Sequence, residues 1–362
     1  MSDVRHLPCE PAATRCVQAF YSRGVRWNRL QLVDGPDSPP ALFGTEAVAR
    51  HFDTPEFAGL TFYEINARTI INKVPAASRV PFQYTVNPYR GCSHACTYCF
   101  ARKTHEYLNL GTGADFDSKI IVKTNAARLL RAELAKPSWR GEPIAMGTNV
   151  DCYQRAEGRY RLMPGIISAL AQAANPFSIL TKGTLILRDL ELLRRAAEVT
   201  EVSTAVSVGL NNLPLWRSVE PGTPRPAARL AVCEKLNAAG IGCSVLLAPI
   251  LPFLTDSAEQ LRAQVAACAA AGATGLTPIV LHLRPGAREW FLKWLWREHP
   301  GLLGDYQLLY SGGSYANKDY QRHIADVVRD LADEYGIPRP KPRPAAEPRP
   351  QPEPELPQPT LF

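Results

Sequence analysis

Short apolar runs alternate with helical patterns between about residues 80 and 283. The runs are rich in β-branched residues and nearly free of charge, which is typical of strands buried on both faces of a parallel sheet. Most of them are followed by a segment with apolar residues at helical spacing. This alternation predicts repeated β–α units, with strands at 82–89, 119–124, 143–149, 177–183, 202–209, 241–252 and 273–283, and helices at 125–136, 163–174, 187–198, 226–240 and 257–272.

The number of units favours a partial (β/α)6, TIM-like barrel over a closed eight-stranded one, because only six or seven strands are predicted. Residues 1–78 show no clear period and predict an N-terminal extension packed on the core. Residues 79–285 form the predicted barrel. Residues 286–337 predict a C-terminal helical cap with helices at 287–297 and 317–335. Residues 338–362 contain ten prolines and predict a disordered tail.

The composition is that of an ordinary globular protein with a large core, with 362 residues, 46% hydrophobic and 21% charged. No apolar run reaches the length of about 18 residues that a membrane span requires, and "MSDVRHLPCE" lacks the apolar region of a secretory signal. We therefore expect a cytoplasmic protein without a membrane partner. Its thiols are then reduced, so clustered cysteines indicate metal or redox chemistry. The net charge of +7 is compatible with an anionic partner such as DNA.

Three of the nine cysteines lie within "NPYRGCSHACTYCFAR", residues 87–102, at the spacing C-x3-C-x2-C: Cys92, Cys96 and Cys99. Structural zinc normally takes four protein ligands, and no second cysteine pair follows. His94 and His105 could complete such a site, so a non-enzymatic zinc-binding structural protein is one alternative. Three thiolates also suit a [4Fe–4S] cluster that keeps one iron open for a small molecule.

The cysteine motif resembles that of the radical SAM superfamily. The segment around it resembles the spore photoproduct lyase group, often labelled DNA repair photolyase, whose pattern is NPY-x-G-C-x-H-x-C-x-Y-C-Y-A-R; Phe100 replaces the last tyrosine here. The segments "GTNVDCYQRAEGRYRLMPGI", "ILTKGTLILRDLELL" and "APILPFLTD" are also similar to this group. The resemblance spans about residues 60–325, and the whole chain is similar to an actinobacterial branch whose name specifies no substrate.

The resemblance implies a partial (β/α)6 barrel and a [4Fe–4S] cluster on Cys92, Cys96 and Cys99. It also implies S-adenosylmethionine on the open iron and its cleavage to a 5′-deoxyadenosyl radical that abstracts hydrogen. It places Tyr98 beside the adenine and gives Lys182, at the end of a predicted strand, the role of pairing with the cofactor carboxylate. Lys123 is a second candidate at a strand end, and Ser207 is a weaker one. The alternatives are solvent-exposed lysines and a serine bonded to backbone.

Cys152 lies in the segment after strand 143–149, which we expect to face the site. Spore photoproduct lyase uses a cysteine in this general loop to return a hydrogen atom to its product radical. Its motif aligns several residues earlier, at 147–149, so an incidental thiol is the alternative. The same segment carries four charged residues that could bind an anionic substrate or form a solvated face: Arg155, Glu157, Arg159 and Arg161. The remaining cysteines are interpreted as structural or incidental: Cys9, Cys16, Cys233, Cys243 and Cys268.

The chain ends in "LPQPTLF", where Gln358, Leu361 and Phe362 match Q-x-x-L-F. This resembles the peptide by which bacterial repair and replication proteins bind the sliding clamp, with apolar anchors in a preformed groove. The alternatives are a chance match in a proline-rich tail and a fold-back of the two apolar residues onto the core.

These observations predict a radical SAM enzyme of lyase or transferase type whose specific reaction the sequence does not identify. The expected substrate is a DNA lesion, and a tRNA base, a peptide or a small metabolite is the alternative. A one-electron reductant such as flavodoxin or ferredoxin is the expected protein partner.

Overall fold

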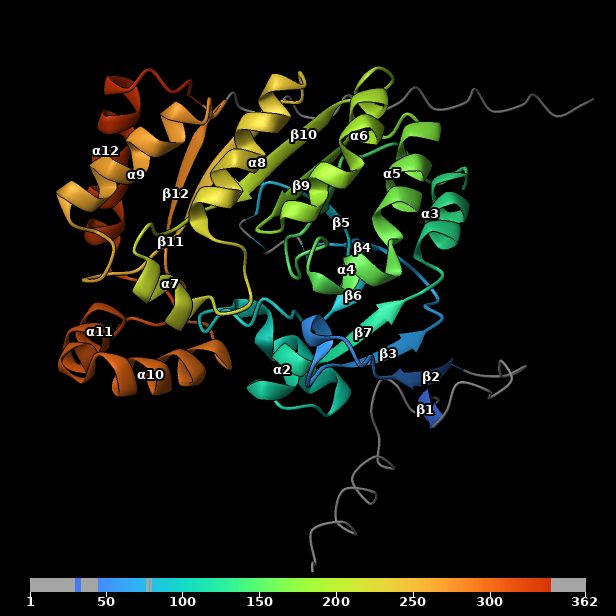
Figure 1. The fold of residues 1–362 in the computed structure, drawn as a ribbon, viewed down its shortest axis with the longest axis horizontal. Helices are drawn as coiled ribbons and strands as arrows, with labels where there is room; N and C mark the ends of the chain where they lie inside the picture. The colour runs from blue at the N-terminus through green and yellow to red at the C-terminus, as the bar shows by residue number, and fades with distance from the viewer. Residues whose placement is uncertain (1–29, 34–44, 76–77, 79, 340–362) are drawn as a thin grey trace, which may run out of the picture.

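The structure is a computed structural model that describes residues 30–33, 45–75, 78 and 80–339. Its larger sheet has seven strands and carries the repeated β–α units (Figure 1). The strand order is β12 (Leu276–Val280), β11 (Cys243–Ile250), β10 (Val202–Ser207), β9 (Phe177–Thr181), β8 (Ile144–Met146), β5 (Tyr84–Val86) and β4 (Ile71–Lys73).

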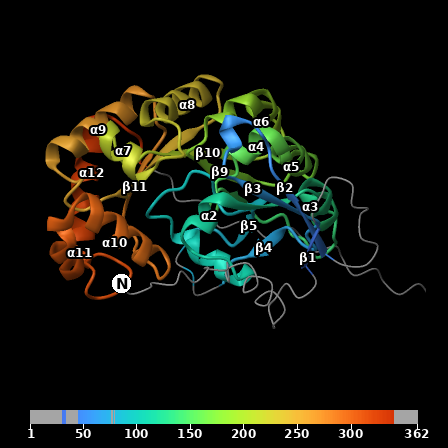
Figure 2. The same cartoon turned by 60° about the horizontal axis from the view of Figure 1, so that its bottom comes forward.

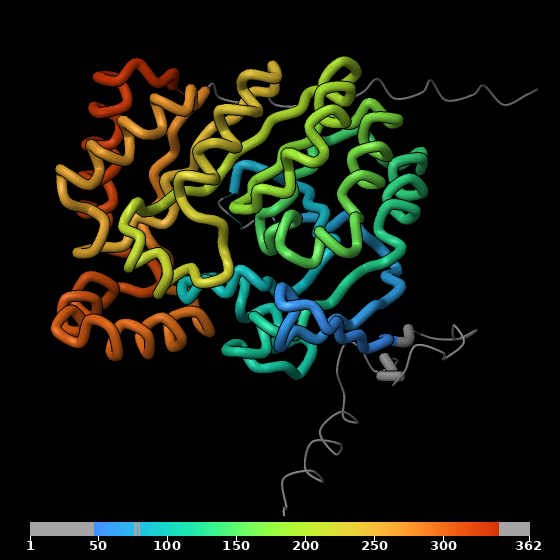
Figure 3. The backbone as a smooth tube through the Cα atoms, in the orientation of Figure 1, coloured from blue at the N-terminus to red at the C-terminus, as the bar shows by residue number. Residues whose placement is uncertain are grey.

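Six of these strands, β5 and β8 to β12, run parallel to one another, and β4 is an antiparallel edge. Helices lie along one face of the sheet and connect the parallel strands (Figures 1 and 3): α3 (Ala126–Leu134), α5 (Leu162–Gln172), α6 (Leu190–Ala197), α8 (Pro226–Ala238) and α9 (Ala258–Ala270). Within the described residues the strand order ends at β12 and β4, so the sheet does not close. The predicted partial barrel is confirmed.

The strand predicted at 119–124 belongs to a different sheet. It is β7 (Lys119–Lys123), in a five-stranded sheet with the order β1 (Leu30–Val33), β2 (Thr45–Arg50), β3 (Thr61–Ile65), β7 and β6 (Tyr89–Arg90). Ile120 and Val122 pack beside Phe62, while Ile121 packs beside Ile65 on the other face. The apolar pattern predicted a strand buried on both faces, which is correct, but it could not tell which sheet buries it.

Several shorter elements connect these strands or lie beyond their ends: η2 (Pro55–Phe57), η3 (Phe100–Leu108), α2 (Ala114–Ser118), α4 (Arg155–Tyr160), η4 (Thr184–Asp189) and α7 (Leu213–Val219). Four more follow β12: α10 (Ala287–Glu298), η5 (Pro300–Leu302), α11 (Leu303–Leu309) and α12 (Lys318–Glu334). Helix α10 packs against η3, and α12 packs against β12 and against α9. Figure 2 shows α12 beside α9. The contact with η3 brings helix α10 next to the segment that follows the cysteines.

Some sequence predictions lie outside the described residues. These are the clamp-type peptide of Gln358, Leu361 and Phe362, nearly all of the proline-rich tail, and Cys9 and Cys16. In the part of the chain that the structure describes, no helix is both long and apolar enough to cross a bilayer.

The parallel strands all point their carboxyl ends toward one end of the sheet. Active sites of parallel barrels form at that end, from the loops that follow each strand. Here those loops carry the cysteine segment after β5 and β6, Asp151 and Cys152 after β8, Lys182 after β9, and Ser207 at the end of β10. Residues far apart in the sequence therefore meet at one site.

Candidate functional site

The cysteine loop starts at a sharp turn after β6. Gly91 has φ +80°, and a Cβ there would lie 2.8 Å from the carbonyl oxygen of Lys119, so only glycine suits this position. Cys92 and Cys96 are buried, and Cys99, just before η3, is half-buried. The three thiols thus lie on one short, largely enclosed segment.

Arg102 supports the cysteine loop through hydrogen bonds and ring contacts. Its side chain is fully buried and donates hydrogen bonds to the carbonyl of Cys96 at 2.8 Å and to the Asp117 carboxylate at 2.8 and 3.0 Å. Its guanidinium also lies over the rings of Phe116 and Trp290, at 5.3 and 5.0 Å from their centroids. Since Trp290 belongs to α10, the C-terminal helices contribute directly to the support of the cysteine loop.

A second support comes from the segment after α7. The amide of Thr97 donates to the Val219 carbonyl and that of Gly222 to the His94 carbonyl, both at 3.0 Å. A Cβ on Gly222 would lie 2.1 Å from the Ser93 carbonyl oxygen, so the two backbones are in close contact. These bonds fix the loop between α7 and α8 against the backbone of the cysteine loop.

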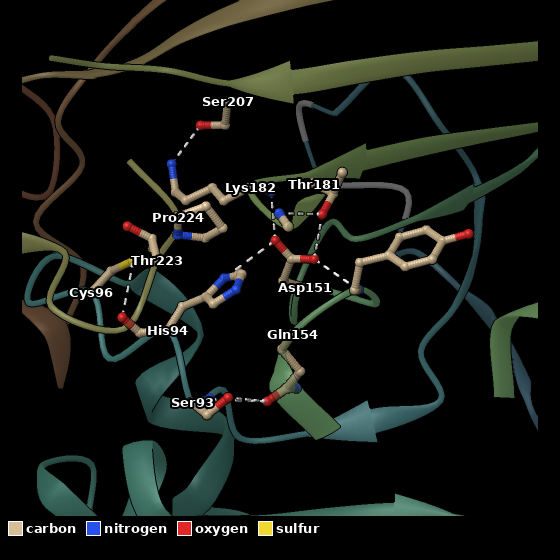
Figure 4. A network of polar contacts seen from close by, with 12 residues as sticks. Ser93, His94, Cys96, Asp151, Gln154, Thr181, Lys182, Ser207, Thr223 and Pro224 are labelled. Atoms are coloured by element: carbon tan, nitrogen blue, oxygen red, sulfur yellow. Dashed lines mark hydrogen bonds and ion pairs between the residues drawn. The ribbon is translucent and has the colours of Figure 1, made fainter. Parts of the chain in front are cut away.

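Gln154 provides the third support. Its side-chain oxygen accepts from the Ser93 amide at 2.9 Å (Figure 4), and its side-chain nitrogen donates to the Gly91 carbonyl at 2.9 Å. Gln154 is fully buried, so both of its polar groups need such partners. The backbone around Cys92 is therefore held on both sides by one amide group.

The donor set fits an iron–sulfur cluster. Burial raises the pKa of the Cys92 thiol well above its ordinary value, and the nearby Asp151, Cys96 and Cys99 raise it further. Burial also raises the pKa of Cys96 and Cys99. Three thiolates on one largely enclosed loop need cationic compensation, and thiolates are the usual ligands of Fe–S clusters.

Both histidines proposed for the zinc alternative have other contacts. Nδ1 of His94 lies 3.3 Å from the Asp151 carboxylate, and Nε2 of His105 lies 3.0 Å from the Lys119 carbonyl oxygen. Across the described ranges, no three His, Cys, Asp or Glu side chains are placed to hold one metal ion. In a cluster the thiolates bind separate irons and need not converge on one point.

Lys182 and Ser207 come together at the ends of β9 and β10. The Lys182 ammonium donates to the Ser207 hydroxyl at 2.6 Å (Figure 4) and to the Ala248 carbonyl at 3.3 Å. The Ser207 hydroxyl in turn donates to the Ala248 carbonyl at 2.8 Å. Lys182 is also 5.8 Å from the centroid of the Tyr98 ring. Three of the predicted cofactor residues, Tyr98, Lys182 and Ser207, are therefore neighbours.

Glu220 connects these residues and was missed by sequence reasoning. This fully buried carboxylate accepts hydrogen bonds from the Tyr98 hydroxyl and the Arg229 guanidinium, and lies 3.4 Å from the Lys182 ammonium. Burial alone would raise its pKa, but Arg229 and Lys182 hold that pKa at about 2. The only sequence signal is an acidic residue in "SVEPGT", between two helices, which is ordinarily taken for a solvated turn.

Asp151 joins two strand ends to the cysteine loop. It accepts hydrogen bonds from the Thr181 hydroxyl and the Lys182 amide, both at 2.6 Å, and from the Tyr153 amide at 2.9 Å (Figure 4). Burial would raise its pKa, but the contacts with His94, Thr181 and Lys182 lower it to about 2. The carboxylate therefore stays charged and orients the backbone that carries Lys182.

Lys123 lies apart from this group, in the second sheet. Its ammonium donates to the Asn87 carbonyl at 2.8 Å, and burial together with Arg90 lowers its pKa to about 8. It thus ties β7 to the backbone that leads into the cysteine loop. None of its hydrogen bonds within the described residues reaches Lys182, Ser207 or Glu220.

Cys152 directly follows Asp151 and is completely buried. Cys152 belongs to the same hydrophobic core cluster as Tyr153. It also lies close enough to Tyr89 and Tyr153 that the charge of a Cys152 thiolate would raise the pKa of both tyrosines. Burial raises the pKa of Cys152 itself well above its ordinary value. The thiol therefore packs as a small neutral group close to the site.

The charged segment after Cys152 is not an open loop. Three of its four charged residues lie in α4 (Arg155–Tyr160), Arg161 follows that helix, and Glu157 is fully buried. Glu157 accepts from the Tyr89 hydroxyl at 2.5 Å and from the Arg188 guanidinium at 2.6 Å, so it is not available to a substrate. Arg159 lies over the Phe52 ring at 4.9 Å. Glu157 therefore neither binds a substrate nor belongs to a solvated face, because Tyr89 and Arg188 occupy its buried carboxylate.

Comparison with known proteins identifies a matching family and individual relatives. Residues 86–265 match the family described as "Radical SAM superfamily". An uncharacterized protein of Mycobacterium tuberculosis is 51% identical over 315 residues, which cover 86% of this chain and 93% of that protein. An uncharacterized protein of Methanocaldococcus jannaschii is 31% identical over 197 residues, covering 53% of this chain and 69% of that one.

Solved structures of spore photoproduct lyase share the fold. A mutant of that enzyme superposes with a TM-score of 0.57 at 15% identity, over 76% of this chain and 79% of the other. The lyase complexed with dinucleoside spore photoproduct gives a TM-score of 0.56 at 16% identity, with the same coverage. A further mutant with bound AdoMet and the dinucleoside gives 0.55 at 15% identity, over 72% and 76% of the two chains.

Proposed function

Because this chain belongs to the radical SAM superfamily, we propose that Cys92, Cys96 and Cys99 bind a [4Fe–4S] cluster to which S-adenosylmethionine also binds. When bound, these cofactors supply a 5′-deoxyadenosyl radical that abstracts a hydrogen atom from the substrate. The observation that carries the proposal is the position of the three thiols. They share one enclosed loop at the carboxyl end of the parallel sheet, next to Lys182 and Tyr98.

The charges beside the loop suit a carboxylate ligand. Lys182 and Arg229 are both cations, and Glu220 is the carboxylate that contacts both. The single negative charge of Glu220 therefore compensates only one of the two positive charges. Of the two cations, Lys182 is the more accessible. We assign Lys182 and Ser207 to the carboxylate end of S-adenosylmethionine and Tyr98 to its adenine side. Glu220 holds Tyr98 and Lys182 in place for this contact.

The radical chemistry is tested on anaerobically purified and reconstituted protein. Incubation with S-adenosylmethionine and dithionite should yield 5′-deoxyadenosine, measured by chromatography, and Cys96→Ala should abolish it. Cys268→Ala is the matched control, because this buried cysteine lies on α9 away from the loop. Product formation that survives Cys96→Ala would contradict the assignment of the cluster.

For the substrate we propose a DNA lesion. The proposal is supported by the fold shared with spore photoproduct lyase, whose complex contains a dinucleoside photoproduct, and by the net charge of +7. The protein would then work in the cytoplasm, with a reductant such as flavodoxin or ferredoxin as its electron donor. The seven described cysteines are free thiols, which suits that reducing compartment.

The substrate assignment is tested with ultraviolet-damaged DNA and the reconstituted enzyme. Mass spectrometry of the digested DNA should show loss of one photoproduct that depends on S-adenosylmethionine and on Cys96. Formation of 5′-deoxyadenosine with every lesion left intact would reject DNA repair. A tRNA base, a peptide or a small metabolite would then be the substrate, identified by transfer of deuterium into 5′-deoxyadenosine.

A further inference from the structure

An aromatic side chain is exposed directly after the last cysteine. Phe100 begins η3 and is 40% exposed, although a phenylalanine ring is costly to leave in water. The guanidinium of Arg284 lies 5.3 Å from its ring centroid, at cation–π distance. The Phe100 ring therefore has Arg284 as a neighbour and keeps a large solvent-exposed surface beside the cysteine loop.

Arg284 reaches this position from the end of β12. Its carbonyl accepts from the amides of Ala287 and Arg288 at 3.1 and 2.8 Å, which fixes the turn into α10. Its side chain is exposed and donates to the Tyr315 hydroxyl at 3.2 Å. In the portion of the chain that the structure describes, Arg284 takes part in no ion pair with a carboxylate. Its charge is thus available to an anionic ligand.

Tyr315 completes the group and is held by backbone contacts. It forms a β-bridge with His282, and the adjacent Leu283 amide donates to the Ser314 carbonyl at 2.8 Å. Its ring meets the His282 ring edge-on with centroids 4.6 Å apart, yet Tyr315 is 43% exposed. An exposed ring that is fixed in this way loses little entropy when a ligand stacks on it.

We propose that Phe100, Arg284 and Tyr315, here called the aromatic rim, bind a single-stranded nucleic acid segment. The two rings stack on its bases, and Arg284 pairs with an adjoining phosphate. Stacking surfaces combined with an unpaired cation are the features that single-strand binding sites use. An acidic redox protein would use the cation but not the exposed rings. The inference rests on the proposed function, for which it specifies how a nucleotide substrate is bound next to the cysteine loop.

The test measures binding and not turnover. Fluorescence anisotropy on reconstituted full-length protein uses a labelled single-stranded oligothymidine and, in a parallel arm, an oligouridine. We expect Phe100→Leu and Tyr315→Leu each to weaken binding about tenfold, the range of one base–aromatic stack. Arg284→Gln should also reduce the slope of log K against log salt by about 0.7, the value for one phosphate of a single strand. The arm that binds more tightly distinguishes DNA from RNA, and either result supports the rim.

Two exposed residues serve as matched controls: Trp296→Leu in the last turn of α10 and Arg322→Gln on α12. Both should leave binding unchanged, and thermal melting confirms that every variant is folded. The rim is rejected if the wild type binds neither strand, or if the control variants weaken binding as much as the rim variants do. The 5′-deoxyadenosine assay is separate, so a failure of the radical chemistry is recognised independently of these results.

Discussion

The ammonium of Lys182 lies 3.4 Å from the carboxylate of Glu220, although the two residues belong to different β–α units. The same carboxylate is bonded to the Arg229 guanidinium and to the hydroxyl of Tyr98, the residue that precedes Cys99. A buried carboxylate needs such cationic partners, because a buried charge without one is costly. Glu220 thus links the cysteine loop, β9 and α8 through a single group.

Glu220→Gln should destabilise the protein by about 3 kcal/mol or more, since it leaves the buried Arg229 without its counter-charge. Chemical unfolding followed by circular dichroism measures this loss. Glu198→Gln is the control, because Glu198 forms an exposed pair with Arg194 on α6, and such pairs contribute at most about 1 kcal/mol. Equal losses in the two variants would show that Glu220 has no special structural role.

Lys182→Met and Lys123→Met separate the two lysines that the sequence nominated for the cofactor. Removing the cation at the end of β9 should weaken S-adenosylmethionine binding about thirtyfold or more, as for other enclosed charge pairs. Lys123→Met should leave that affinity unchanged and cost about 1 kcal/mol of stability, because it removes the hydrogen bond to Asn87. Calorimetric titration of the reconstituted protein measures both affinities. A drop in affinity for Lys123→Met alone would reverse the assignment.

Cys152→Ala tests whether the buried thiol acts in the reaction. Because Cys152 is 0% exposed and packed in the core, we expect the variant to keep its iron content and its formation of 5′-deoxyadenosine. The expected cost is about 1 kcal/mol of stability. The yield of repaired or modified substrate should also persist. Loss of that product with normal 5′-deoxyadenosine would instead identify Cys152 as a hydrogen-atom donor.

The sequence predicted the parallel strands and their helices because the strands are short apolar runs and the helices carry apolar residues at helical spacing. Cys243, Val245 and Leu247, for example, alternate inward along β11 within an apolar run. The spacing of Cys92, Cys96 and Cys99 singled out the cysteine loop for a separate reason: the chemistry of thiolate ligands restricts it. Both signals are local in sequence.

Contacts between distant segments could not be predicted in this way. Glu220 meets Tyr98 from 122 residues away, and nothing within "SVEPGT" indicates that it is buried. The sheet that receives β7 depends on its pairing with β3, which a single apolar run does not specify. The aromatic rim likewise combines the residue after Cys99 with two residues from the C-terminal part of the chain.

His105 should make stability depend on pH. Burial lowers the pKa of this histidine from 6.5 to about 4, so it stays neutral in the folded state while the unfolded chain takes up a proton. Stability is then fully present above about pH 6.5 and is lost as pH falls toward 4, by up to about 3 kcal/mol. Asp117, whose pKa is raised to about 6 by burial, acts in the opposite direction. Asp117 is present in both wild type and His105→Gln, so its contribution cancels when the two pH dependences are compared.

The melting temperature of wild type should therefore fall more between about pH 7 and about pH 5 than that of His105→Gln, when both are measured in the same buffers. The variant is expected to start lower at neutral pH, because it disturbs the contact with the Lys119 carbonyl below Gly91. Only the difference in slope reports the titration. Parallel pH profiles for the two proteins would show that His105 takes up its proton equally in both states.

Gly222→Ala should release the cysteine loop from its outer support. The added Cβ would lie 2.1 Å from the Ser93 carbonyl oxygen, which belongs to backbone and cannot swing away. The segment after α7 must then move, and its hydrogen bond to the His94 carbonyl is strained or lost. We expect a lower iron content after reconstitution and a lower melting temperature. Gly242→Ala is the matched control, since its Cβ meets nothing within 4 Å. Full iron loading of Gly222→Ala would show that the loop forms its site without this contact.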